Sequence, residues 1–432
     1  MAKLISFGKY DKKYKYVIFY ILIRLPFEYF LGDFFPEEIK IKYFRRENFP
    51  NKIIIYEIFK YLGILIFGLI VLKIEIESLF NENKSYNNDD NQGSKKEIEL
   101  IYYENQSFPN TAPTPVFFVI ILYVIDIKII DFCYSIFFIS GLEFWMIEII
   151  FIVVINIILF KIKIYIHQKV SIAIILFFST LMKIISIISI FKNDKKRIFV
   201  ENIWIAPIGI ILFLLLYFAD AYIICKMKWY FDLKFISDKK ILILFGFLGT
   251  IIFFLCSIIS HFIECKTDIF SSYLCSVYDE KDSKKYFDNF IIFFKNIWME
   301  DRNAFINCLY ILIIILKILF SAFQYFFSFL IIKLLGPEYL VCADSILFFL
   351  IKIISLIFYL INKSLKSEFL FDFLSQFFSL LGTIIYLELI ELNFCKLNYN
   401  LKRNINIRSN IEILDIFTES DDKSEQESNS GD

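Results

Sequence analysis

Two apolar runs of membrane-spanning length, joined by a short polar turn, constrain the fold of this chain more than any other feature. The first run follows Gly336 and extends from Tyr339 to about Ile361. After a polar turn at residues 362–366, the second run covers about Phe369 to Ile390. A helix needs about twenty apolar residues to cross a bilayer. The pattern therefore predicts a transmembrane helical hairpin, and similar runs recur through most of the sequence.

The composition agrees with this interpretation. Of 432 residues, 58% are hydrophobic and 19% are aromatic, which is more than the single core of a soluble protein of this size could bury. We therefore expect an all-α fold, a polytopic α-helical transmembrane bundle whose main partner is the lipid bilayer. The 46 basic and 46 acidic residues cancel, so no basic field suggests a nucleic-acid partner.

The apolar runs predict nine or ten spans. Eight candidate spans come before the hairpin: Val17–Phe30, Ile53–Leu72, Val116–Ser140, Glu143–Phe160, Ser171–Phe191, Ile203–Cys225, Ile241–Ile263 and Phe305–Leu335. The first of these either crosses the membrane or lies in its interface, with Arg24 and Glu28 paired one turn apart. Ten spans would place both termini on the cytoplasmic side, and we prefer that number, although the basic connectors do not follow a strict positive-inside pattern.

The regions between and beyond the spans differ in charge and complexity. We divide the chain into a basic N-terminal segment (1–16), a transmembrane helical domain (17–390) with long loops at 73–114 and 264–304, a juxtamembrane segment (391–417) and an acidic tail (418–432). The juxtamembrane segment is predicted to begin as a continuation of the last helix. The serine-rich acidic tail is predicted to be disordered and to offer a site for cytosolic protein partners.

No sequence signature of a soluble enzyme is present. The histidines are His167 and His261, too far apart for a zinc-binding HExxH motif, and no phosphate-binding loop, CxxC pair or GxSxG elbow occurs. We therefore predict no catalytic, cofactor-binding or metal-ligating residues, and the sequence favours a role other than catalysis. Cys265 and Cys275 share a polar loop, where either a disulfide or two free thiols is compatible with the sequence.

Charged residues inside the apolar runs are the remaining functional signal. An ionisable group at membrane depth costs about 2.5–3.5 kcal/mol, so such groups usually face the bundle interior or water. The candidate intramembrane polar path consists of Asp126, Lys128, Asp131, Lys317, Asp344, Lys352 and Glu388. A local Lys128–Asp131 pair would be the structural alternative for that part of the path. Glu388 and Glu391 also fit a solvated helix end.

Three functions remain open at this stage. The intramembrane charges favour a transporter or channel-like protein. The long loops and the acidic tail favour, as an alternative, a non-catalytic membrane receptor or scaffold. A membrane-embedded enzyme acting on lipids is a third possibility, but no cluster of catalytic side chains supports it. The arrangement of the charges in space discriminates between these functions, because a permeation path requires them to converge.

Overall fold

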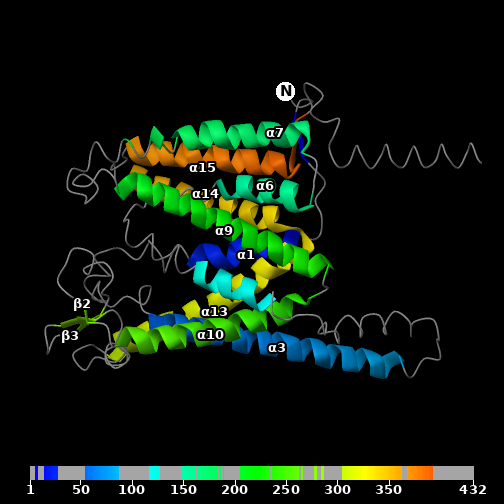
Figure 1. Cartoon of the computed structure of the whole chain (residues 1–432), viewed down its shortest axis with the longest axis vertical. Coiled ribbons are helices and arrows are strands. Elements are labelled where there is room, and N and C mark those ends of the chain that lie inside the picture. Colours follow the sequence, from blue (N-terminus) through cyan, green and yellow to red (C-terminus); the bar gives the residue numbers. More distant parts are fainter. Residues whose placement is uncertain are drawn as a thin grey trace, which may run out of the picture.

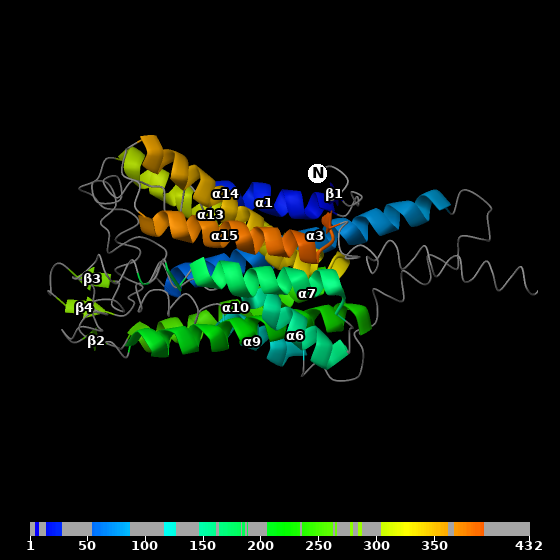
Figure 2. The same ribbon diagram turned by 90° about the horizontal axis from the view of Figure 1, so that it is seen from above.

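The protein is predominantly helical in the part of the chain that the structure describes. The computed structural model describes residues 5–7, 14–27, 54–86, 116–126, 147–160, 164–182, 184–185, 188, 205–233, 236–261, 264–265, 277–279, 284–286, 304–361 and 367–392. The helices lie side by side with roughly aligned axes and form a bundle (Figures 1 and 2). The acidic tail 418–432, and the juxtamembrane segment beyond residue 392, lie outside the described residues.

The first helix, α1 (Lys15–Phe27), is short and packs on two long helices. Its 13 residues reach about 20 Å, less than the 30 Å of a hydrocarbon core. It packs against α13 (Ala304–Leu334) and α14 (Pro337–Ile361) and buries Tyr20 and Ile21 there. Figure 2 shows α1 at the edge of the bundle, beside α13 and α14, and its outer side chains Ile18, Phe19 and Leu22 are exposed.

The longest helix, α3 (Ile54–Tyr86), forms the most extensive pairing in the fold with α10 (Asp238–His261). The helix continues well past Leu72, where the sequence had predicted the start of a loop. Glycines let the two backbones approach closely. A Cβ placed on Gly246 of α10 would lie 2.5 Å from the backbone nitrogen of Leu65 on α3.

The middle of the chain contributes α6 (Glu148–Phe160), which packs against α9 (Ile205–Leu233). Between them in sequence, α7 (Ile166–Ala173) runs directly into the π-helix η6 (Ile174–Ser179). The wider turn of a π-helix is rare, and it is often found at functional sites. Both α7 and η6 pack against α15 (Ser367–Tyr386).

The two helices predicted to follow Gly336 are present. Gly336 has φ +125°, a conformation that glycine adopts freely, and its N–H bonds to the carbonyl of Ile331 at the end of α13. The next helix, α14, begins at Pro337, a position where proline loses no helical hydrogen bond. Helices α14 and α15 then pack against one another.

The end of α15 differs from the prediction. The helix stops at Tyr386 rather than at Ile390, and Glu388 follows in a left-handed conformation with φ 60°. The strand β5 (Ile390–Leu392) comes next and pairs antiparallel with β1 (Ile5–Phe7). The predicted helical continuation is therefore wrong, and Glu391 lies in a strand rather than one helical turn from Glu388.

A second small sheet lies in the long loop after α10. The strands β2 (Glu264–Cys265), β3 (Val277–Asp279) and β4 (Lys284–Tyr286) form an antiparallel sheet in the order β2-β4-β3. Cys275 lies outside the described residues, so the alternatives for Cys265 stand as before.

Aromatic side chains fill the contact between α3, α10 and α13. Tyr61, Phe245 and Phe329 are completely buried. The ring of Phe245 lies 5.1 Å from that of Tyr61 and 5.6 Å from that of Phe329, both in edge-on geometry. Such contacts add to the free energy of burial. Bulky rings and a few glycines thus replace the small-residue interfaces that are common between membrane helices.

Within the described ranges, four helical segments are long and apolar enough to cross a membrane: Asp238–Ile259, Ile311–Leu334, Pro337–Ile361 and Phe369–Tyr386. Their outer faces expose large apolar side chains, such as Ile259, Ile315 and Ile361. Apolar patches of this extent are unusual on soluble proteins. These features indicate a membrane protein.

Candidate functional site

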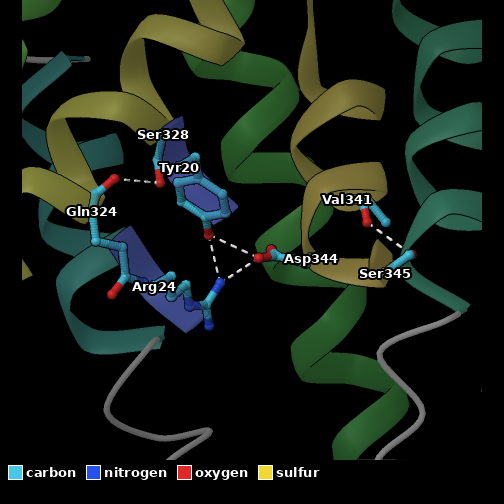
Figure 3. Close-up of polar contacts among 7 residues, drawn as sticks. All are labelled: Tyr20, Arg24, Gln324, Ser328, Val341, Asp344 and Ser345. Atoms are coloured by element: carbon cyan, nitrogen blue, oxygen red, sulfur yellow. Dashed lines mark hydrogen bonds and ion pairs between the residues drawn. The ribbon is translucent and has the colours of Figure 1, made fainter. Parts of the chain in front are cut away.

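An ion pair between the first helix and α14 lies at the centre of the candidate site. The hydroxyl of Tyr20 donates a hydrogen bond of 2.7 Å to Oδ1 of Asp344 (Figure 3). Nη1 of Arg24 donates to the same carboxylate oxygen and, over 2.5 Å, to the hydroxyl of Tyr20. The three side chains therefore form a closed triangle of polar contacts, and the charge of Asp344 has a direct counter-charge.

Helical spacing explains how the two helices present these groups. Tyr20 and Arg24 are one turn apart on α1 and so share a face. Asp344 and Phe348 have the same relation on α14. The guanidinium carbon of Arg24 lies 5.6 Å from the centre of the Tyr20 ring and 5.7 Å from that of Phe348. These rings hold the planar guanidinium against the carboxylate.

Nearby serines do not belong to this network. Ser345 donates to the carbonyl of Val341 over 2.8 Å, and Ser328 donates to the carbonyl of Gln324 over 2.9 Å (Figure 3). Each hydroxyl is thus satisfied within its own helix, as is common for serine in apolar helices.

Three further carboxylates lie around the Arg24–Asp344 pair. Glu148 of α6 is within electrostatic range of Asp126, Asp220 and Asp344, and also of Arg24. Asp220 of α9 is likewise within range of Asp126 and Asp344. We call Asp126, Glu148, Asp220 and Asp344 the acidic cluster. Its members come from α6, α9, α14 and the helix Val116–Asp126, and α1 supplies the arginine.

The acidic cluster is short of partners. Asp126 and Glu148 are buried, with exposed fractions of 6% and 9%. Oδ2 of Asp126 and Oδ1 of Asp220 are buried without a hydrogen-bond partner among the described residues. A buried polar atom in this state costs about 1–3 kcal/mol. The cluster would therefore be stabilised by anything that brings it positive charge or hydrogen-bond donors.

The acidic cluster holds more acidic groups than the one arginine paired with it. Four carboxylates make up the cluster and Arg24 pairs with one of them, so ionisation of all four would leave an excess of negative charge. No set of three His, Cys, Asp or Glu side chains among the described residues is close enough to hold a metal ion. Carboxylates that share an apolar site can instead take up protons.

The structure separates the residues of the predicted polar path into groups. Asp126 and Asp344 belong to the acidic cluster. Lys352 pairs with Asp372 over 2.6 Å, and Glu388 lies 3.1 Å from Nε2 of His167; both pairs involve the region of α15. Lys317 is buried in α13. Lys128 and Asp131 lie outside the described residues.

The predicted polar path left out several of the site residues, although the sequence had marked Glu148 and Asp220 as charges within apolar runs. Arg24 had been considered only with Glu28, which lies outside the described residues. Glu148 and Asp220 are charges within apolar runs, the same signal that identified Asp126. Tyr20 carried no such signal, because an apolar run rich in aromatic residues does not distinguish one tyrosine from another.

The chain matches no protein-family profile and no curated protein sequence.

Proposed function

We propose that the chain is a multi-pass integral membrane protein of nine or ten spans that transports protons or a small monovalent cation. The acidic cluster is the site that takes up the transported charge. The observation that carries this proposal is the grouping of Asp126, Glu148, Asp220 and Asp344 within electrostatic range of one another, with Arg24 paired to Asp344. Each of the four carboxylates comes from a different helix.

Membrane energetics support this function. Charged groups at membrane depth are costly and usually belong to ion pathways or proton relays. A purely structural polar network would be fully hydrogen-bonded. Asp126 and Asp220 each keep a buried oxygen without a partner in the described chain, as expected of groups that gain and lose a bound proton or cation.

Arg24 gives the site an internal competitor for the transported cation. Its guanidinium neutralises Asp344, which leaves the other three carboxylates to bind the incoming charge. The pair also fixes α1 to α14, so a movement of either helix would change how much of the negative charge is compensated. Such a change in affinity is a requirement of transport.

Flux measurements on the purified chain in liposomes test the proposal. A pH-sensitive dye inside the vesicles reports proton entry after a membrane potential is imposed, and sodium and potassium gradients are applied in parallel. We expect flux well above that of empty vesicles, and a several-fold loss in Asp126→Asn and Asp220→Asn.

A matched control lies on the same helix as Asp220. Asp232 of α9 is exposed and pairs with Lys228 one turn away, so Asp232→Asn should retain the wild-type flux. A chain that carries no flux under any of these gradients would contradict the proposal and make a receptor or scaffold role the better account.

A further inference from the structure

One face of α15 is polar along most of the helix although it is buried. This α15 polar face consists of Asp372, Ser375, Gln376, Ser379 and Thr383, whose exposed fractions are all 7% or less. With about 100° of rotation per residue, these positions fall within an arc of about 100° on one side of the helix. An apolar membrane-spanning helix has no need of such a face for packing.

The α15 polar face lies between two contacts with neighbouring helices. On one side, the rings of Phe373 and Phe377 lie 5.4 Å and 6.0 Å from the ring of Phe349 on α14. On the other side, the hydroxyl of Ser171 on α7 donates to the carbonyl of Gly382 over 2.5 Å. Figure 1 shows α15 between α7 and α14 in the same order. The polar side chains thus point between these helices.

A contact between side chains closes each end of this face, and an acidic residue takes part in both. Asp372 binds Lys352 of α14 at one end, over 2.6 Å. Near the other end, Glu388 lies 3.1 Å from His167 of α7. The helix from Asp372 to Tyr386 is about 21 Å long, at 1.5 Å per residue. Between the two pairs the face carries only amide and hydroxyl groups.

Two side chains of the face, Gln376 and Ser379, lack hydrogen-bond partners among the described residues. Both polar atoms of the Gln376 amide, and the hydroxyl of Ser379, are buried without a partner in the described residues. Thr383 differs, because its hydroxyl donates to the carbonyl of Ser379 over 2.8 Å. A buried amide with two unmet groups costs several kcal/mol, so Gln376 and Ser379 require a partner that the packed side chains do not supply.

The π-helix η6 borders the same region. It contacts α15, and its wider turn makes the backbone N–H of Thr180 bond to the carbonyl of Ile175, five residues back. Turns of this kind re-aim side chains at functional sites. This irregular turn thus lies next to the part of α15 that contains the unpartnered groups.

We propose that the α15 polar face lines a water-accessible path for small uncharged solutes, separate from the acidic cluster. An amide and hydroxyls can exchange hydrogen bonds with water or with a small polyol as it passes. A bare ion would find no counter-charge between the two end pairs, and its desolvation would not be compensated. None of the residues of this face belongs to the acidic cluster.

Thiol labelling tests whether water reaches the face. Ser379→Cys and Phe377→Cys are compared in membranes with a small charged thiosulfonate, and adducts are located by mass spectrometry. Phe377 is at the same depth but 41% exposed on the outer side of the helix. Because the reagent attacks the thiolate, which does not form in hydrocarbon, only position 379 should react. Equal labelling at both positions would overturn the proposal. Ser375→Cys is the substitute if Ser379→Cys does not fold.

Permeability measurements test the solute class. Vesicles containing the full chain are mixed rapidly with hypertonic sucrose, or with glycerol, and their volume is followed by light scattering. We expect water and glycerol to cross several-fold faster than in empty vesicles, and Gln376→Leu to remove most of that gain while proton flux through the acidic cluster persists. Permeability equal to that of empty vesicles would overturn this proposal without affecting the proposed ion transport.

Discussion

Arg24 and Asp344 are 320 positions apart in the sequence and form a largely buried ion pair. The pair ties the first described helix of the bundle to α14. It also places a positive charge directly against the acidic cluster. The short helix α1 is therefore as important for the electrostatics of the interior as for its packing.

Replacing Arg24 by glutamine should destabilise the protein strongly. Removal of one partner from a buried ion pair costs about 3–5 kcal/mol, since the remaining charge is left uncompensated. Thermal unfolding of the detergent-purified protein measures the effect. The double variant with Asp344→Asn should recover part of the loss, and a double-mutant cycle gives the coupling between the two side chains.

An exposed ion pair provides the control for this measurement. Lys73 and Glu77 on α3 are one turn apart, with exposed side chains. Lys73→Gln should lower stability by less than about 0.5 kcal/mol. An effect of Arg24→Gln no larger than that of the control would show that the buried pair contributes nothing.

Asp126→Asn should leave the stability unchanged or raise it. The carboxylate of Asp126 has a buried oxygen without a partner in the described chain, so the substitution removes a desolvated acid rather than a stabilising contact. The same unfolding assay should therefore separate Asp126→Asn from Asp344→Asn, which loses the negative charge that pairs with Arg24. Equal destabilisation by the two variants would contradict this assignment.

Gly246→Ala should weaken the pairing of α3 and α10. Its new methyl group would lie 2.5 Å from the Leu65 nitrogen and 2.8 Å from the Leu65 Cα, so the backbones must separate. We expect a loss of about 1–3 kcal/mol. Gly68→Ala is the matched control in the same interface, because its nearest contact is the flexible side chain of Ile243 at 2.9 Å. A larger loss at Gly68 than at Gly246 would contradict the described packing.

Exchange of the charges at one end of the α15 polar face should be tolerated better than removal of one charge. Lys352→Ala leaves Asp372 buried without its ion-pair partner, and Asp372→Ala does the same to Lys352. The combined exchange Lys352→Asp and Asp372→Lys restores an attraction between the same positions. Its melting temperature should exceed that of either single alanine variant. A double exchange that is less stable than both would argue against a simple ion pair.

The apolar runs predicted α10, α13, α14 and α15 well, because a continuous run of apolar residues ends where charge or glycine begins. The same signal failed for α3, which continues beyond Leu72 through polar residues. Helix propensity and pairs such as Lys73–Glu77 stabilise that extension. The early end of α15 was also missed, since nothing about glutamate predicts the left-handed φ of Glu388.

The candidate site was only partly predictable. The sequence shows which charges lie within apolar runs, and so it identified Asp126 and Asp344. It does not show which of them meet, because contacts between separate helices depend on their packing. The α15 polar face could have been found from its helical spacing, since Asp372, Gln376, Ser379 and Thr383 recur every three or four residues.

The small sheet formed by β1 and β5 has a topological consequence. Strands that share backbone hydrogen bonds lie on the same side of a bilayer. Because Ser6 is paired with Glu391, the chain between them must cross the membrane an even number of times in the proposed topology. Nine crossings within that interval are thus ruled out by parity, whereas ten are allowed. Reporter groups fused near Phe7 and near Leu392 should accordingly report the same compartment.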